Sequence, residues 1–112
     1  MIAPLLEALR EKDPATWKRF DGLELATYKQ YDDYGTTENY IYQEDLIALV
    51  RMAWLQAVLQ ETIQARGWDF TLSTLKYKNR CIARIDMIDE NKTVQYGDSP
   101  TEALLAAYIG AL

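Results

Sequence analysis

The residue types that most often carry catalysis or bind metals are scarce in this chain. It contains no histidine, and Cys81 is its only cysteine. Most zinc sites, the serine–histidine–aspartate triad and the cysteine–histidine pair need these residues, so the composition argues against all of them. Cys81 falls on the apolar side of a predicted strand, where a lone thiol usually packs as a small hydrophobic side chain. We therefore expect no metal site and no cofactor.

Two arrangements of carboxylates remain as candidates for acid–base chemistry. Asp32 and Asp33 are adjacent in the sequence. In most backbone conformations their side chains point apart, which suits a catalytic pair poorly. Asp86 lies two residues after Arg84 in a predicted strand and is expected opposite Thr71 on the polar face of the sheet. A surface ion pair with Arg84 explains that pattern without catalysis. The sequence shows no phosphate-binding glycine loop, dinucleotide fingerprint or metal-spaced ligand set. We expect the protein not to be an enzyme.

Tyrosine and negative charge are concentrated in one segment of the chain. The formal net charge is −5, from 17 acidic and 12 basic residues, and no lysine or arginine lies between Gln30 and Val50. Tyrosine offers a large contact area and a polar tip, and binding surfaces favour it. Two interpretations stay open: the tyrosines complete the core beneath a loop, or they form a surface that binds a protein partner with a basic surface. The candidate partner-binding residues are Tyr28, Tyr31, Asp32, Asp33, Tyr34, Glu38, Tyr40, Tyr42, Glu44 and Asp45.

A basic stretch beginning at Lys76 is the rival site. Lys76, Lys78, Arg80 and Arg84 cluster on a predicted hairpin, with Tyr77 between the first two. Basic residues interleaved with an aromatic ring can hold phosphate or nucleic acid, although such a tip is usually only solvated. Because the chain as a whole is acidic, we do not expect nucleic acid as its main partner. The basic hairpin is the alternative site.

The elements that must position these residues are clearest in the second half of the chain. Residues 68–74 and 81–87 alternate apolar with polar side chains, which predicts two strands that are each buried on one face. A two-residue turn at 78–79 would place Leu72 opposite Ile85. The sequence therefore predicts a β-hairpin with a defined register.

A third strand and a closing helix are predicted to follow. A two-residue turn at 90–91 would place Tyr96 opposite Ile85, and so on the apolar face of the sheet. Ser99 is expected to cap the closing helix, and Glu102 to complete a capping box.

Helices are predicted in most of the first 66 residues. The first two meet at Asp13-Pro14, where Asp13 is expected to cap the second helix and Pro14 to be its first residue. A long third helix runs from Glu44 to Arg66, ended by Gly67. The second helix is expected to continue beyond Gly22 with Leu23 and Tyr28 directed inward, and a break at Gly22 is the alternative. Residues 36–43 are expected to form a loop or a short extended piece. The expected fold class is α+β, in the order α-α-α-β-β-β-α, with a three-stranded antiparallel sheet packed against helices.

The length of 112 residues predicts a single domain over 1–112. Within it we expect an N-terminal helical part, residues 1–43, and a core module, residues 44–112. The longest uncharged run, Ala103 to Leu112, is too short to span a membrane. We therefore expect no membrane partner and a cytoplasmic location in a bacterial host.

The closing helix carries apolar residues on two faces, which one sheet cannot cover. Leu104 and Tyr108 lie on one face, and Leu105 and Ile109 on another. Either the N-terminal helices cover the second face, or a second copy of the chain does, and an isologous contact is the commonest solution. We favour a homodimer, with Leu105, Ile109 and Leu112 as candidate interface residues.

The order of helix, three antiparallel strands and helix is similar to the double-stranded-RNA-binding domain. Residues 97–103, which lead into an alanine-rich helix, look like the start of that domain's final helix. In that family, lysines at this point grip phosphates, whereas this chain has Pro100, Thr101 and Glu102. The resemblance implies the topology without the RNA-binding residues.

Short motifs also resemble small bacteriophage proteins of the phage α/β/α (ABA) sandwich domain type. The matching stretches are residues 5–9, 19–26, 67–70 and 99–104. That family has no assigned activity, so the resemblance implies a phage or prophage origin. Together with the acidic, tyrosine-rich segment, it predicts a non-catalytic accessory protein that covers a basic surface, for example on a host-defence or nucleic-acid enzyme. A ligand-sequestering oligomer is a further alternative.

Overall fold

The computed structural model describes residues 2–22, 28–31, 37–40, 44–75 and 80–112, and for residues 28–31, 37–40 and 44–49 it describes only the backbone. In chain order, the elements are α1 (Ala3–Lys12), α2 (Pro14–Asp21), β1 (Tyr28–Tyr31), β2 (Thr37–Tyr40), α3 (Glu44–Ala65), β3 (Asp69–Leu75), β4 (Arg80–Asp86), a 3₁₀ turn (Ile88–Glu90), β5 (Lys92–Gly97) and α4 (Pro100–Ala111).

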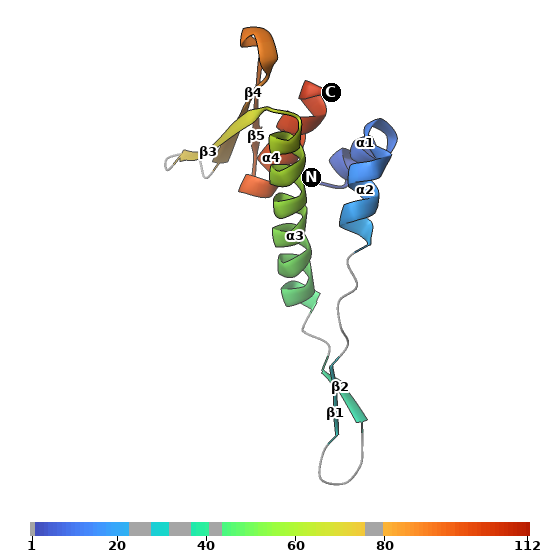
Figure 1. Cartoon of the computed structure of the whole chain (residues 1–112). Helices are drawn as coiled ribbons and strands as arrows, with labels where there is room; N and C mark the ends of the chain where they lie inside the picture. Colours follow the sequence, from blue (N-terminus) through green and yellow to red (C-terminus); the bar gives the residue numbers. More distant parts are fainter. Residues whose placement is uncertain (1, 23–27, 32–36, 41–43, 76–79) are drawn as a thin grey trace.

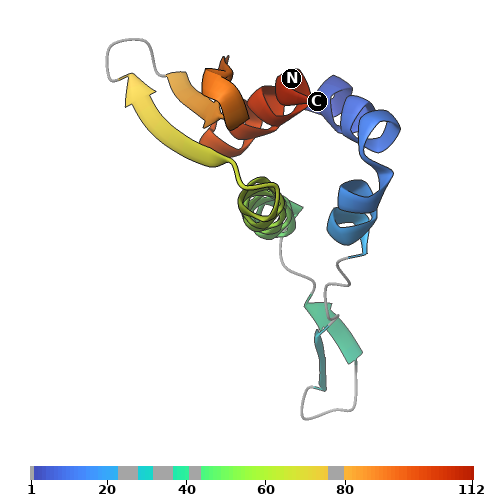
Figure 2. The ribbon, with the colours of Figure 1, turned by 45° about the horizontal axis from the view of Figure 1, so that its top comes forward.

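The central unit is a three-stranded antiparallel sheet in the order β3-β4-β5. Helix α4 packs across one face of the sheet, and α3 and α1 lie against α4 (Figures 1 and 2). Helix α2 packs on α3. The α+β fold expected from the sequence is confirmed. Within the described ranges, no helix is long and apolar enough to cross a bilayer.

The hydrophobic core lies between the sheet and the helices, and every packed helix contributes to it. It follows that the N-terminal helices complete the core, since their inward residues are as buried as those of the closing helix. The core includes Leu9 of α1, Phe20 of α2, Leu55, Leu59 and Ile63 of α3, Cys81, Ala83 and Ile85 of β4, and Leu104, Leu105 and Tyr108 of α4.

The first hairpin has the expected faces but a different register. Phe70, and not Leu72, lies opposite Ile85, while Leu72 lies opposite Ala83. The register differs from the prediction by two residues. Because side chains alternate with a period of two, a slip of two keeps every side chain on its predicted face. Cys81 and Ile85 are accordingly buried.

In the second hairpin the side chains of β5 lie on the faces opposite to those predicted, because the connection between β4 and β5 is longer than a two-residue turn. Asp89 and Glu90 adopt positive φ values of 63° and 64°, and the Met87 N–H donates to the Asn91 carbonyl at 2.7 Å. Tyr96 then pairs with Ile82 and not with Ile85. The slip is odd, so Tyr96 lies on the outer face and is 53% exposed.

The predicted helix ends are largely confirmed. The Asp13 side chain accepts a hydrogen bond from the Thr16 N–H, and Ser99 accepts one from the Glu102 N–H at 3.1 Å. The capping box differs in one detail, since the Glu102 carboxylate accepts from the Asp98 N–H at 3.0 Å and not from Ser99. Gly67 ends α3 with a φ of 76°, a conformation that glycine adopts without strain.

The segment between α2 and α3 contains a second, small sheet that the sequence did not predict. Helix α2 ends at Asp21, with Gly22 as its C-cap, so the break at the glycine is the alternative that occurs. Strands β1 and β2 pair antiparallel, with Tyr28 opposite Tyr40. Figures 1 and 2 show this hairpin beyond the first residues of α3, well away from the three-stranded sheet.

Candidate functional site

The β1–β2 hairpin brings together residues that are far apart in the acidic, tyrosine-rich segment. Its register places Tyr28 opposite Tyr40, Gln30 opposite Glu38, and Tyr31 opposite Thr37. Directly opposed residues of an antiparallel pair have Cα atoms about 4.5–5.5 Å apart. Of the other candidates, Glu44 and Asp45 begin α3, whereas Asp32, Asp33, Tyr34 and Tyr42 lie outside the described residues.

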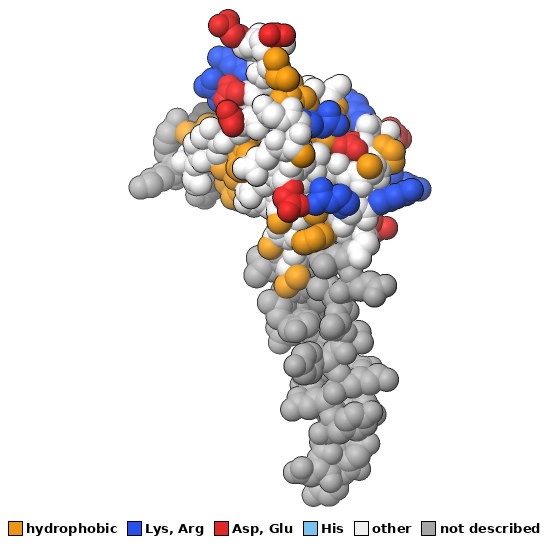
Figure 3. Space-filling view, viewed as in Figure 1, with side chains coloured by type: hydrophobic (Ala, Val, Ile, Leu, Met, Phe, Trp, Pro, Cys, Tyr) orange, Lys and Arg blue, Asp and Glu red, His pale blue; other side chains and the backbone are white. Residues whose placement is uncertain are grey.

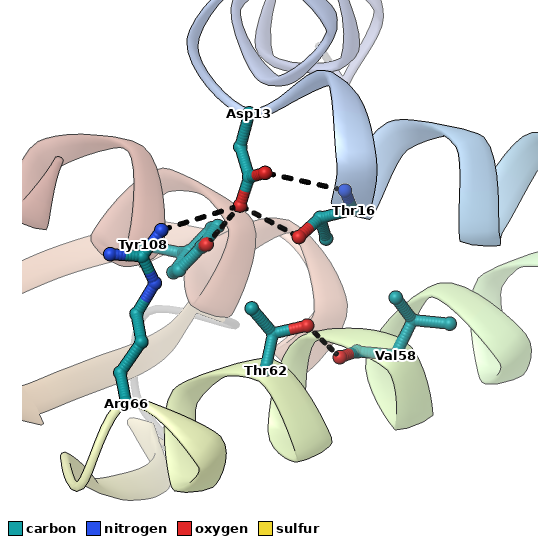
Figure 4. A network of polar contacts seen from close by, with 6 residues as sticks. All are labelled: Asp13, Thr16, Val58, Thr62, Arg66 and Tyr108. Atoms are coloured by element: carbon teal, nitrogen blue, oxygen red, sulfur yellow. Dashed lines mark hydrogen bonds and ion pairs between the residues drawn. The ribbon is translucent and has the colours of Figure 1, made fainter.

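A polar cluster at the junction of α1 and α2 is the most tightly connected group of side chains in the described part of the chain (Figure 4). The Asp13 carboxylate accepts hydrogen bonds from the Tyr108 hydroxyl of α4 and from the Thr16 hydroxyl, the latter at 2.7 Å. The Arg66 guanidinium lies 3.6 Å from the same carboxylate. The cluster joins the α1–α2 junction to the C-terminal end of α3 and to α4.

The pKa values of the two acidic groups in this cluster, Asp13 and Tyr108, are both shifted further from neutral pH. Burial by itself raises the pKa of Asp13, but hydrogen bonds from Thr16 and Tyr108 and the charge of Arg66 outweigh it and lower that pKa. Burial, followed by the hydrogen bond to Asp13, raises the pKa of Tyr108. At pH 7 the carboxylate is therefore ionised and the phenol keeps its proton, which suits a structural joint and not proton transfer.

Arg66 also stacks on the aromatic rings beside this cluster. Its guanidinium lies 5.1 Å from the centroid of the Trp68 ring and 5.7 Å from that of Tyr108. The centroids of the two rings are 6.4 Å apart, and the ring planes are tilted relative to each other. Cation–π contacts of this kind add to the ion pair with Asp13. The cluster was not predicted from the sequence, although Tyr108 carries the only polar side chain between Ala103 and Leu112, which was a signal for it.

Helix α2 is fixed on α3 by a second set of contacts. Arg19 forms an ion pair with Glu61, and the Trp54 indole N–H donates to the Arg19 carbonyl at 3.1 Å. The Arg51 guanidinium lies 5.2 Å from the centroid of the Phe20 ring. These groups are engaged within the chain, so this side of α3 serves to hold the N-terminal helices.

The predicted basic site is only partly described, and its described part is balanced by acids. Lys76 and Lys78 lie outside the described residues, whereas Arg80 and Arg84 belong to β4. As expected, Arg84 pairs with Asp86, at 2.9 Å. Asp86 lies opposite Asp69 of β3 and opposite Lys92 of β5, and not opposite Thr71 as predicted. The outer face of the sheet thus carries both signs of charge.

The predicted oligomer interface on α4 needs correction at one residue. Leu105 is fully buried within the single chain, because α1 lies against α4 and supplies the missing cover. Ile109 is partly buried against the core cluster, and only Leu112 is exposed, at 41%. A second copy is not needed to cover Leu105.

Near the start of α4, the side chain of Thr101 faces the protein interior. Thr101 is buried, and its hydroxyl lies 2.9 Å from the Gln56 side-chain oxygen and 3.4 Å from the Met52 carbonyl of α3. A residue in this position cannot reach a phosphate backbone, in contrast to the lysines of the double-stranded-RNA-binding domain.

Comparison of the chain with protein-family models, curated proteins and solved structures found no match in any of the three. The two family resemblances therefore depend on the sequence motifs alone. Within the described ranges, no group of three or more cysteine, aspartate or glutamate residues is arranged to hold a metal ion.

Proposed function

We propose that the protein is a non-catalytic binding protein that contacts a protein partner through the segment from Tyr28 to Asp45. The observation that carries this proposal is the separation of the β1–β2 hairpin from the core. Its two strands pair with each other and belong to a different sheet from the one on which the helices pack (Figures 1 and 2). A segment outside the core is free to use its tyrosines for contact with another molecule.

The charge distribution supports a basic partner. Figure 3 shows acidic and basic side chains interspersed over the described part of the molecule that faces the viewer. Between Gln30 and Val50, however, there are five acidic residues and no basic ones, and these five acids equal the net charge of −5. A local field of one sign attracts a surface of the opposite sign and speeds association.

We infer the kind of partner from the short motifs that resemble those of small phage proteins. A phage or prophage product of this size, acting in the bacterial cytoplasm, would cover a basic surface that a host enzyme uses for nucleic acid. Host-defence and nucleic-acid enzymes carry such surfaces because they bind phosphate backbones. The proposed effect is inhibition by occlusion.

A charge-reversal pair tests the site directly. Asp32→Lys with Asp33→Lys changes the net charge by +4, and so does the control Glu7→Lys with Glu11→Lys on exposed positions of α1. Each protein is immobilised, and the proteins it retains from bacterial lysate are quantified by mass spectrometry at several salt concentrations. We expect the first variant to retain about tenfold less of the salt-sensitive partner than the unmodified protein does, and the control to retain the same amount. Equal retention by both variants would remove the segment as the binding site.

Nucleic-acid binding by the outer face of the sheet is the second candidate function. Arg84, Tyr96 and Lys92 share that face, and a basic sheet surface with an exposed aromatic ring suits single-stranded nucleic acid. The negative charges of Asp69 and Asp86 on the same face repel phosphate groups and so argue against this function. Titration of mixed oligonucleotides at low salt distinguishes the two functions, since an absence of binding there excludes this one.

A further inference from the structure

Strand β3 has one edge that is paired and one that is not. It lies at the end of the order β3-β4-β5 and pairs over seven residues with β4. Figures 1 and 2 show no other described helix or strand along its outer edge. The backbone N–H and C=O groups that point away from β4 therefore have no strand partner among the described residues, and such groups form a template for another strand.

The sequence of β3 does not protect this edge. Residues 70–75, Phe-Thr-Leu-Ser-Thr-Leu, contain no charge, no proline and no glycine. Exposed edges are usually protected by lysine, proline or a bulge, which prevent pairing with other chains. The only charge in β3 is that of Asp69 at its first position, whereas the opposite edge strand, β5, begins with a lysine, Lys92, the residue type that usually protects such an edge. The difference between the two edges favours β3 as the strand that pairs with another chain.

We propose that two copies of this chain pair through β3, antiparallel about a two-fold axis, to form a continuous six-stranded sheet. The inference is independent of the proposed function, because β3 lies in a different sheet from β1 and β2. It also places the dimer contact elsewhere than α4, where Leu105 is already covered.

The residues of β3 complement themselves when the axis passes through Leu72. Thr71 then lies opposite the partner's Ser73, and Phe70 lies opposite the partner's Thr74. Hydroxyl pairs and aromatic–β-branched pairs are among the favourable cross-strand pairs of antiparallel sheets. Thr71 and Ser73 are exposed on the outer face, as this pairing requires.

The inner face of β3 gains cover from the same contact. Phe70 and Leu72 pack against the core but remain partly exposed at the edge of the sheet. Pairing places Leu72 beside the partner's Leu72 and extends the apolar layer from one copy to the other, which is favourable in proportion to the area removed from water. The dimer closes, because each copy uses its β3 edge, and the other edge of the same sheet, β5, begins with Lys92.

A charge-swap pair at the exposed positions tests this interface. With T71E/S73E, like charges face each other twice across the axis, whereas T71E/S73K places opposite charges there. Both positions are exposed, and position 71 lies opposite Arg84 within the chain, so each variant should fold. Sedimentation equilibrium of the full chain measures the dimer dissociation constant. We expect T71E/S73E to raise it about tenfold or more and T71E/S73K to restore it.

Hydrogen exchange of the unmodified chain gives a second measurement. Within residues 70–75, the amides that point away from β4 should exchange more slowly as the protein concentration rises, while those of β5 should not change. The control V94E/Y96E adds two acids to the exposed outer face of β5 and should leave the dimer intact. The proposal is overturned by a chain that stays monomeric at all concentrations, by a larger assembly, or by a dimer that T71E/S73E does not weaken.

Discussion

Asp13 is the residue at which the N-terminal helices are tied to the remainder of the fold. It caps α2 through the Thr16 N–H, and the same carboxylate accepts the hydroxyl of Tyr108 from the other end of the chain. The sequence predicted the cap, because Asp-Pro at a helix start has a local signature. It did not predict the contact with Tyr108, which joins residues 95 positions apart and depends on how the helices pack.

Removing the hydroxyl of Tyr108 should therefore destabilise the protein. Tyr108→Phe leaves the buried ring in place but removes a hydrogen bond to an ionised carboxylate. We expect the free energy of unfolding to fall by about 1.5–3 kcal/mol, measured by urea denaturation. The control Tyr96→Phe, on an exposed tyrosine, should change it by less than about 0.5 kcal/mol. Equal effects of the two substitutions would contradict the proposed role of the cluster.

The lowered pKa of Asp13 predicts how stability depends on acid. Its pKa in the folded state lies below its ordinary value of 3.8, so the unfolded chain binds the proton more readily. The stabilisation is present above the ordinary pKa and is lost as the pH falls through the lower, folded-state pKa. Asp13→Asn keeps a capping side chain but cannot titrate. We expect the difference in unfolding free energy between wild type and this variant to shrink as the pH falls below about 4. A difference independent of pH would contradict the assignment.

At the scale of elements, the sequence predicted the three strands of the larger sheet and their order better than it predicted their register. In β3 and β4 the alternation of side chains fixes which face is buried, and a slip of two residues leaves that unchanged. In β5 the alternation alone could not predict the register, because the left-handed residues Asp89 and Glu90 lengthen the connection. Aspartate tolerates this conformation but glutamate rarely adopts it, so a turn could be predicted there but not its length.

The contact between β5 and α4 gives a prediction at this scale. A Cβ at Gly97 would lie 2.5 Å from the backbone nitrogen of Ala103, whereas one at Gly110 would meet only side-chain tips of Thr93 and Gln95. Backbone at the start of α4 cannot move aside easily, so Gly97→Ala should lower the free energy of unfolding by about 1–3 kcal/mol. Gly110→Ala should cost much less, because alanine also favours the helix. Thermal unfolding monitored by circular dichroism compares the two, and a larger loss for Gly110→Ala would contradict the packing.

At the scale of the molecule, charged residues and tyrosines are distributed differently in two parts of the chain. The part with the core carries interspersed charges, and the part that follows α2 carries the excess of acid together with five of the eight tyrosines. The sequence indicated this division through composition alone. It could not show that residues 28–31 and 37–40 would pair into a separate hairpin, because that pairing lacks the strong apolar alternation that marks β3 and β4.

The tyrosines of β1 and β2 are proposed to serve binding and not to complete the core. The double substitution Tyr28→Ser with Tyr40→Ser tests this by urea denaturation, with Phe20→Ala as the control for a buried ring. We predict a change in unfolding free energy of less than about 0.5 kcal/mol for the tyrosine variant, against about 3–5 kcal/mol for the control. A loss for the tyrosine variant as large as that of the control would show that these rings belong to the core, and would contradict the proposed function.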